Sequence, residues 1–234
     1  MKSLFYILFF LLLSFEGLAQ INFPALSGRN FTYPLIGTQY WMDRNLDVTT
    51  YRDGTVIPQE IDRTAWGNLT TGAWCYYNND AANGAIYGKL YNWYAVMGIA
   101  TAESATPTTA EIAARKQLAP QGWHIPTDAE WTTLSTFLGG QSLAGGKMKT
   151  TGIARWNSPN TDATNLSGFT GLPGGYRFSN GSFGSVGGAG YWWSAVQSNS
   201  RDAIYRYLTN YDGYFGRYDF PKTLGYSVRC LRDL

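Results

Sequence analysis

"GWHIPTDAEW", residues Gly122 to Trp131, carries the only histidine of the chain together with a complete helix start. Thr127 and Glu130 have the spacing of a capping box, in which the threonine hydroxyl accepts from the glutamate amide and the glutamate carboxylate reaches back to the threonine amide. Apolar residues follow at helical spacing. They predict a helix from Thr127 to about Leu138, with Trp131 buried beneath it.

His124 is the one residue of this stretch that could act as a general base or a metal ligand. It lies between Trp123 and Ile125 in a short apolar strand, and no other histidine or cysteine is nearby in the sequence. We therefore expect a buried, hydrogen-bonded histidine. The carboxylates of Asp128 and Glu130 belong in the first turn of a helix. The stretch thus predicts a structural joint and no catalytic residue, metal site or cofactor.

The N-terminus has the pattern of a secretory signal peptide over residues 1–19: a basic start, a short apolar run and small residues before the expected cleavage site. The apolar run is shorter than the roughly 20 residues that cross a membrane, so no membrane span is predicted. We expect an exported protein of a Gram-negative bacterium, periplasmic or at the outer surface. An N-terminal extension, 20–30, and a single domain, 31–234, would follow.

The composition points to binding rather than to nucleic-acid contact. The net charge is only +2 without basic runs, which argues against a nucleic-acid partner. Aromatic residues make up 16% of the chain and charged residues 15%, against about 25% charged in ordinary soluble domains. So many rings exceed what one core needs. Part of them should lie on the surface and contact a ligand.

Local patterns predict an alternation of short elements. We expect a hairpin around Gly37 within 31–48, an amphipathic helix over 87–97, and an insertion at 101–117 with a short helix opened by Thr108. Residues 139–190 are rich in glycine and should form long loops with short strands. Strands are expected at Gly190–Val196, Ala203–Thr209 and Gly225–Asp233.

Several blocks resemble the Fibrobacter succinogenes major paralogous domain, among them "IGTQYWMDRNL" (36–46), "YGKLYNWYAV" (87–96) and the closing "YSVRCLRD" (226–233). More distantly, "HIPTDAEW" (124–131) is similar to a block of the formylglycine-generating enzymes. That similarity implies an α+β, C-type-lectin-like fold: two main helices packed on small twisted antiparallel sheets, with long glycine-rich loops that carry the binding surface.

The chain has two cysteines, Cys75 and Cys230. An even number of cysteines in a chain that is expected to be exported favours a disulfide. The alternative is two buried thiols. Members of the family often have Cys-Pro before "GWH", whereas this chain has Ala119-Pro120. The resemblance therefore leaves Cys75 and Cys230 to pair with each other.

Three functions fit these observations. The first is an exported, non-catalytic module that binds a surface glycan or a surface protein and serves adhesion. The second is a structural protein of cell-envelope assembly. The third, an oxidase like the formylglycine-generating enzymes, needs two close reactive cysteines, and Cys230 has no near neighbour in the sequence. For the first, aromatic rings offer the flat apolar face that suits a sugar, although they could instead pack under the loops. The candidate ligand-binding residues are Trp156, Tyr211, Asp212, Tyr214, Arg217 and Tyr218.

Overall fold

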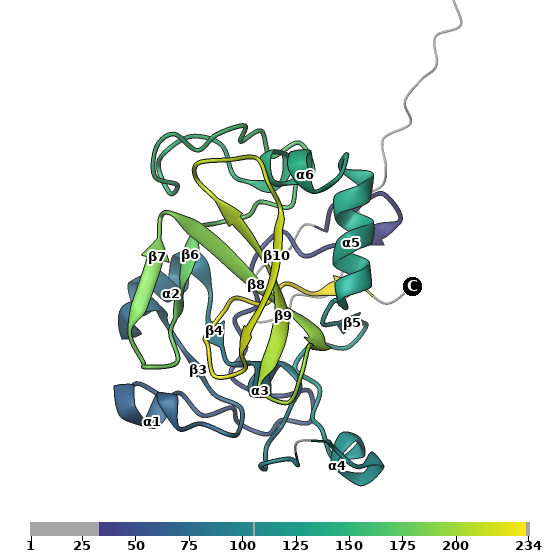
Figure 1. The fold of residues 1–234 in the computed structure, drawn as a ribbon, viewed down its shortest axis with the longest axis vertical. Coiled ribbons are helices and arrows are strands. Elements are labelled where there is room, and N and C mark those ends of the chain that lie inside the picture. The colour runs from purple at the N-terminus through teal and green to yellow at the C-terminus, as the bar shows by residue number, and fades with distance from the viewer. Residues whose placement is uncertain (1–32, 105, 233–234) are drawn as a thin grey trace, which may run out of the picture.

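A curled five-stranded sheet forms the centre of the molecule, whose computed structural model describes residues 33–104 and 106–232 (Figure 1). The predicted signal peptide and the extension lie outside the described residues. All neighbouring strands are antiparallel except β6 and β8, which are parallel. In sheet order the strands are β10 (Gly216–Pro221), β9 (Asp202–Thr209), β8 (Ala189–Gln197), β6 (Gly174–Arg177) and β7 (Phe183–Val186).

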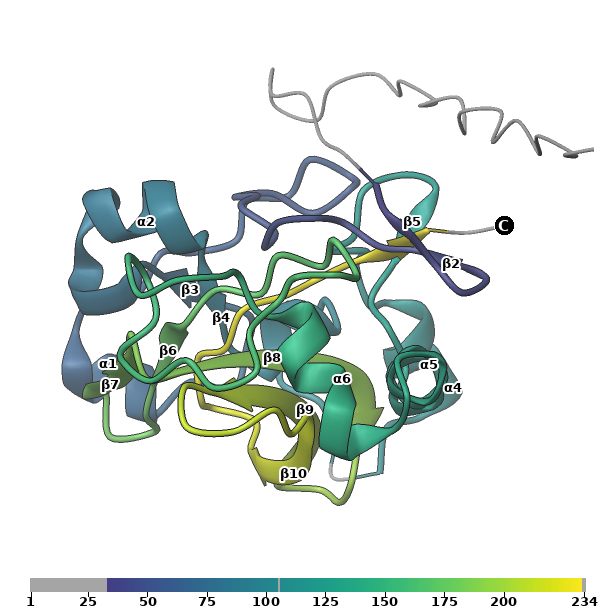
Figure 2. The same ribbon diagram turned by 90° about the horizontal axis from the view of Figure 1, so that it is seen from above.

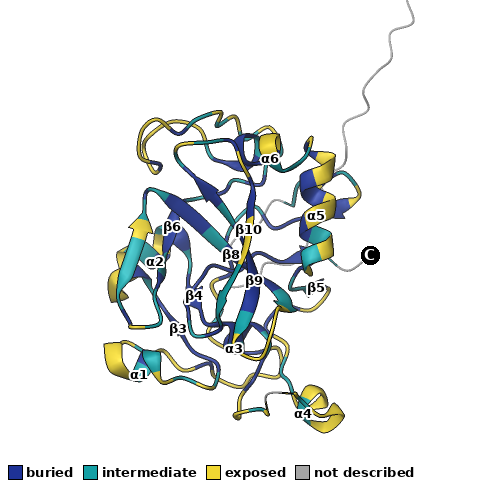
Figure 3. Ribbon diagram, viewed as in Figure 1, coloured by how far each residue is buried: buried dark blue, intermediate teal, exposed yellow. Residues whose placement is uncertain are grey.

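The central strand β8 is buried on both faces along its middle (Figure 3). Successive side chains of a strand point to opposite faces, so Trp192 and Trp193 enter different hydrophobic clusters. Their indole nitrogens also find separate acceptors, the Asn45 side chain at 2.8 Å and the Tyr91 carbonyl at 2.9 Å. The sheet therefore separates two hydrophobic cores, one on each of its faces.

Shorter elements surround this sheet. Figure 2 shows β9 and β10 at one edge of the molecule and the first hairpin at the opposite edge. Three two-stranded sheets pair β1 (Leu35–Ile36) with β2 (Gln39–Tyr40), β3 (Trp74–Cys75) with β4 (Leu90–Tyr91), and β5 (Trp123–His124) with β11 (Leu231–Arg232). The helices are α1 (Arg63–Gly67), the 3₁₀ turn η2 (Tyr77–Asn79), α2 (Ala81–Tyr87), α3 (Trp93–Val96), α4 (Thr109–Ala113), α5 (Asp128–Phe137) and α6 (Gln141–Met148).

The helix expected after "GWHIP" is present as α5, and its start is the predicted capping box. The Thr127 hydroxyl accepts from the Glu130 amide, and the Glu130 carboxylate accepts from the Thr127 amide at 2.7 Å. Trp131 is fully buried, as predicted, with its ring 4.5 Å from that of Trp41. The predicted hairpin around Gly37 and the short helix capped by Thr108 are likewise present.

The predicted fold class is wrong. The chain is 21% helical and 26% strand, and one curled mixed sheet dominates it instead of two main helices on small antiparallel sheets. The C-type-lectin-like architecture is thereby overturned. The strands of the large sheet come together through long-range register, which local patterns do not specify. No helix within the described part of the chain is long and apolar enough to cross a membrane.

The amphipathic helix expected over 87–97 is also wrong. Gly88, with φ +76°, ends α2, and Leu90 then pairs with Cys75 in a two-stranded sheet. A new helix, α3, starts only after Asn92, whose side chain accepts from the Ala95 amide. The apolar spacing thus comes from two buried elements joined by a turn rather than from one helix face.

The glycine-rich stretch expected to be loop contains α6. A side-chain carbon on Gly145 would lie 2.6 Å from the Tyr214 carbonyl oxygen, and one on Gly146 would lie 2.5 Å from that of Asp162. Two loops therefore lie directly against this helix. Because glycine has no side chain, these two positions let the loops approach α6 closely. This packing offsets the low helix propensity of glycine.

Buried cations hold the irregular segments together. Arg177 donates to the carbonyl oxygens of Ile61 and Asp62, and its guanidinium lies 4.4 Å from the centre of the Trp66 ring. Arg229 donates to the Met42 carbonyl at 2.8 Å. Both arginine side chains are fully buried. Buried carbonyl groups need donors, and these cations supply them where strand and helix ladders do not.

Candidate ligand-binding site

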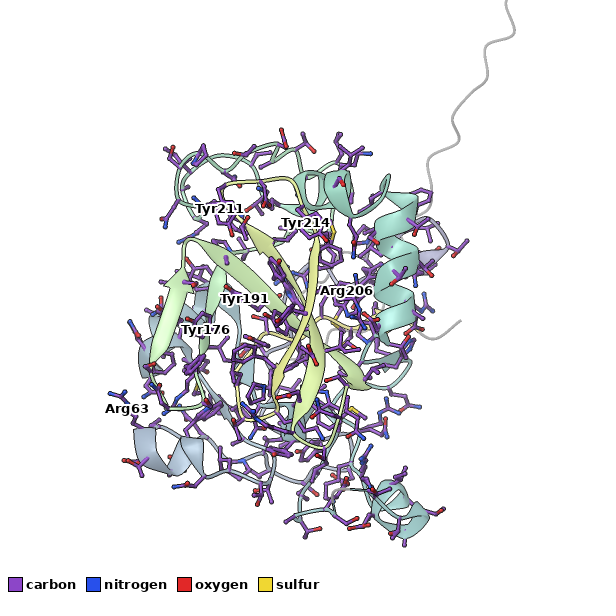
Figure 4. The ribbon with its side chains drawn as sticks, in the orientation of Figure 1. Arg63, Tyr176, Tyr191, Arg206, Tyr211 and Tyr214 are labelled. Carbon is purple, nitrogen blue, oxygen red and sulfur yellow. The ribbon has the colours of Figure 1, made fainter. Side chains whose placement is uncertain are left out.

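Tyrosine side chains from four strands and from the segment after β10 gather on one face of the large sheet. The register brings them together, since Tyr191 is the cross-strand partner of Tyr207 and Tyr205 that of Tyr218. In Figure 4, Tyr211, Tyr191 and Tyr176 follow one another across the sheet, and Arg206 lies toward α5. We define the tyrosine face as Tyr176, Tyr191, Tyr205, Tyr207, Tyr218 and Tyr226.

The rings of the tyrosine face are in mutual contact. Tyr191 stacks on Tyr226 with ring centres 5.1 Å apart, and Tyr176 meets the same Tyr191 edge-on at 5.4 Å. Tyr207 lies 6.2 Å from Tyr191. These distances and angles are those that aromatic pairs favour. The rings consequently hold each other in place before any ligand arrives.

Exposure increases from the base of the face to its edge. Tyr226 and Tyr205 are buried, Tyr176 and Tyr191 are half-buried, and Tyr218 is 58% exposed. A surface of this kind combines a rigid base with accessible rings. Interfaces that recognise ligands place tyrosine in this way because its ring is large and loses little entropy.

Two glycines make room for the rings. Gly216 is the cross-strand partner of Tyr207, and a side-chain carbon on it would lie 2.0 Å from the Tyr207 ring. Gly184 is the cross-strand partner of Tyr176, whose ring would be 2.9 Å from such a carbon. Each ring therefore leans across the neighbouring strand over a glycine.

The buried and half-buried hydroxyl groups of Tyr205 and Tyr207 stay protonated. Burial raises the pKa of Tyr205 to about 12, with the neighbouring Tyr191 acting in the same direction. Burial and the nearby Tyr214, Tyr211 and Asp212 raise the pKa of Tyr207. Tyr205 and Tyr207 therefore offer neutral hydroxyl groups, which both donate and accept hydrogen bonds.

The predicted loop residues lie partly at the rim of this face. Tyr211 is 66% exposed and lies near enough to Tyr191 and Tyr207 to raise the pKa of both. Tyr214 is 38% exposed and donates from its hydroxyl to the Gln141 side chain at 3.2 Å. Asp212 shapes the turn: its carboxylate accepts from the Thr209 hydroxyl and from the Tyr214 amide.

Two other candidates lie elsewhere. Trp156 is 1% exposed, and its indole donates to the Gly171 carbonyl, so a ligand cannot reach it. Arg217 points to the opposite face of β10, where its guanidinium contacts the Asp128 carboxylate at 2.8 Å. Asp128 also binds the buried Arg206 at 2.6 Å. This acidic residue joins α5 to the sheet in addition to its place in the first turn.

The model of the Fibrobacter succinogenes major domain matches residues 35–232, nearly the whole described chain. The chain belongs to this family. The matched region lies within the domain expected over 31–234. No curated protein matches the chain, and no solved structure does.

The disulfide predicted from the even number of cysteines and from the family resemblance is not seen in the structure. Cys75 and Cys230, both within the described residues, are buried and remain thiols. They belong to separate hydrophobic clusters. Burial raises the pKa of Cys75 to about 12, against a smaller opposing effect of Arg177. The thiolate, which is the reactive form, is therefore disfavoured at this position.

His124 makes the expected hydrogen bond but is only half-buried. Its Nε2 lies 2.8 Å from the Glu130 carboxylate. Glu130 in turn bonds the Thr127 amide and hydroxyl, so the pair extends the helix cap. Within the described ranges, no group of three or more His, Cys, Asp or Glu side chains could hold a metal.

A hollow of about 380 Å³ lies away from the tyrosine face, between residues 42–48 and the C-terminal half of α2. Its polar side chains have partners inside the protein. Asp47 pairs with Lys89, and the Asn45 amide donates to the Tyr87 carbonyl at 2.8 Å. These polar side chains therefore hold the surrounding chain in position rather than bind a ligand.

Sequence reasoning missed most of the tyrosine face. Tyr176 and Tyr191 lie outside the predicted set, as do Tyr205, Tyr207 and Tyr226. The signal was present in "AIYRYLT" (203–209), where two tyrosines alternate with other residues and so share one face. Their partners on β8 and β10 follow only from the register.

Proposed function

We propose that this chain is an exported, non-catalytic binding module and that a carbohydrate binds to its tyrosine face. One observation supports this most directly: a contiguous set of rings is held rigid at its base and is accessible at its edge. Tyr218 and the rim residue Tyr211 supply the most accessible rings. The periplasm or the outer cell surface is the proposed location.

The chemistry of the face suits a sugar. A pyranose has an apolar C–H face and a ring of hydroxyl groups, and each tyrosine offers an apolar face and one hydroxyl. Tyr191 has a further hydroxyl beside it, since Ser185 hydrogen-bonds it. A ligand can thus exchange its water contacts for ring and hydroxyl contacts together.

The side chains most suited to chemistry are committed elsewhere, which supports a non-catalytic role. Cys75 is buried with a raised pKa. Glu130 belongs to the cap of α5, and His124 binds that same carboxylate. An oxidase would need two cysteines that react together, and Cys75 and Cys230 lie in separate clusters.

A glycan array tests the proposal with matched variants. We expect the wild-type chain to retain one class of glycan and the double variant Tyr211→Ala/Tyr218→Ala to bind it at least roughly tenfold more weakly, the loss of about 1.4 kcal/mol. Both side chains are mostly exposed, so the thermal midpoint should barely move. Phe137→Ala removes an exposed ring on α5 and should leave binding intact. Equal binding by the double variant, or no retained glycan, contradicts the proposal.

A further inference from the structure

Lys149 lies at the end of α6 and is fully buried. Its ammonium group donates to three backbone carbonyl oxygens, those of Thr161 at 2.7 Å, Thr209 at 2.8 Å and Asp212 at 2.7 Å. An ammonium has three donors and no acceptor. Its hydrogen-bonding capacity is therefore used completely, by oxygen atoms from the loop after α6, the last residue of β9 and the turn that follows β9.

These two loops are the ones that pack against the glycines of α6. In Figure 1 the loop between β9 and β10 reaches α6, and its Asn210 carbonyl accepts from the Thr161 amide of the long loop that follows α6. The Gly146 amide donates to the Gly213 carbonyl, and the Phe215 amide to that of Gln141. Lys149 thus sits where α6 and both loops meet, beneath the turn that carries Tyr211.

The surroundings of the ammonium are those of a cation site. Besides the carbonyl oxygens, the carboxylates of Asp162 and Asp212 act on Lys149 and favour its charged form, against the larger opposing effect of burial. The Asp162 carboxylate lies against Gly213 in the same turn. Carbonyl and carboxylate oxygens together are the ligands that a hard cation such as Ca²⁺ prefers.

We propose that Lys149 is a built-in cation: its ammonium fills an oxygen-lined site that would otherwise suit a hard metal ion, and so fixes the turn carrying Tyr211 and Tyr214 without a metal. Lys149 is then a positioning residue. The inference concerns the turn and holds whether or not the tyrosine face binds a sugar.

Two substitutions separate charge from volume. Lys149→Ala removes the ammonium and leaves space, whereas Lys149→Met fills the space without charge. Both should lower the thermal midpoint by roughly 5–10 °C, because buried carbonyl groups lose their donors. Calcium chloride at millimolar concentration should restore much of the midpoint of Lys149→Ala and none of that of Lys149→Met. The wild-type midpoint should respond neither to calcium nor to a chelator.

Lys147→Ala is the matched control. Lys147 lies in the last turn of α6 and donates to the carbonyl of Leu138, the residue that ends α5. Its removal should create no response to calcium. The proposal is overturned if Lys149→Met is as stable as the wild type, or if Lys149→Ala folds but ignores calcium.

A measurement on the wild type covers the case in which Lys149→Ala does not fold. Buried, fully hydrogen-bonded ammonium protons exchange slowly with water, so a ¹H–¹⁵N spectrum should show the Lys149 ammonium, assigned by its loss in Lys149→Met. An exchange rate equal to that of Lys116, whose side chain is 27% exposed, contradicts the proposal.

Discussion

Thr127 and Glu130 show how one residue pair sets both a helix start and its pH dependence. Burial acts to raise the pKa of Glu130, but hydrogen bonds from Thr127 and His124 lower it below its usual value of 4.5. A group with a lowered folded-state pKa stabilises the fold fully above its unfolded pKa and loses this contribution as the pH falls through the folded value.

Thr127→Ala should therefore cost about 1 kcal/mol of unfolding free energy at neutral pH, and less as the pH drops below about 4. Urea unfolding of both proteins across this pH range measures the difference. Thr133→Ala, which removes an exposed hydroxyl in the same helix, should be nearly neutral throughout. A cost of Thr127→Ala that stays constant down to about pH 3 would show that Glu130 takes no part.

Cys75 and Cys230 should behave as protected thiols. Both side chains are buried, so a thiol reagent should leave the native protein unlabelled and should label both cysteines once urea unfolds it without reductant. A reductant should not change the thermal midpoint. If the unfolded, unreduced chain resists labelling, the cysteines are joined after all.

At the scale of elements, the fit of Tyr207 over Gly216 makes a strand pairing part of the binding surface. Gly216→Ala would bring a methyl group to 2.0 Å from the ring, so the ring must leave its place. We expect a cost of about 1–3 kcal/mol and weaker glycan binding. Gly188→Ala is the control, because the nearest atom there is 3.6 Å away. Adding Tyr207→Ala to Gly216→Ala should restore stability without restoring binding. A stable Gly216→Ala chain would contradict the fit.

The predictable elements are those whose causes are local. The cap of α5 depends only on four consecutive residues that begin at Thr127. Strands β8 and β9 are runs of alternating, strand-forming side chains. The α6 helix could not be predicted this way, because Gly145 and Gly146 favour a loop by their local sequence. Only the tertiary structure shows the two loops that pack against them and explain the glycines. Strand β10 was missed because its six residues do not alternate between buried and exposed, which is the pattern that marks a half-buried strand.

At the scale of the whole molecule, the order of strands decides both the fold and the site. The parallel contact between β6 and β8 brings Tyr176 beside Tyr191, and no short pattern in the sequence specifies it. The candidate residues taken from one loop, such as Tyr211, therefore mark only the rim of the tyrosine face. Aromatic content correctly suggested surface rings, but their location required the register.

The buried cations that bind main-chain oxygens affect which parts of the amino-acid sequence can vary. Every amino acid carries the carbonyl group that Lys149, Arg177 and Arg229 bind, so these contacts do not depend on which side chain stands at the carbonyl's position. The amino-acid sequence of the loops can then change while the path of their main chain is kept. A library randomised at exposed loop positions such as Tyr211, with the three cations kept, would be a scaffold for new binding specificities.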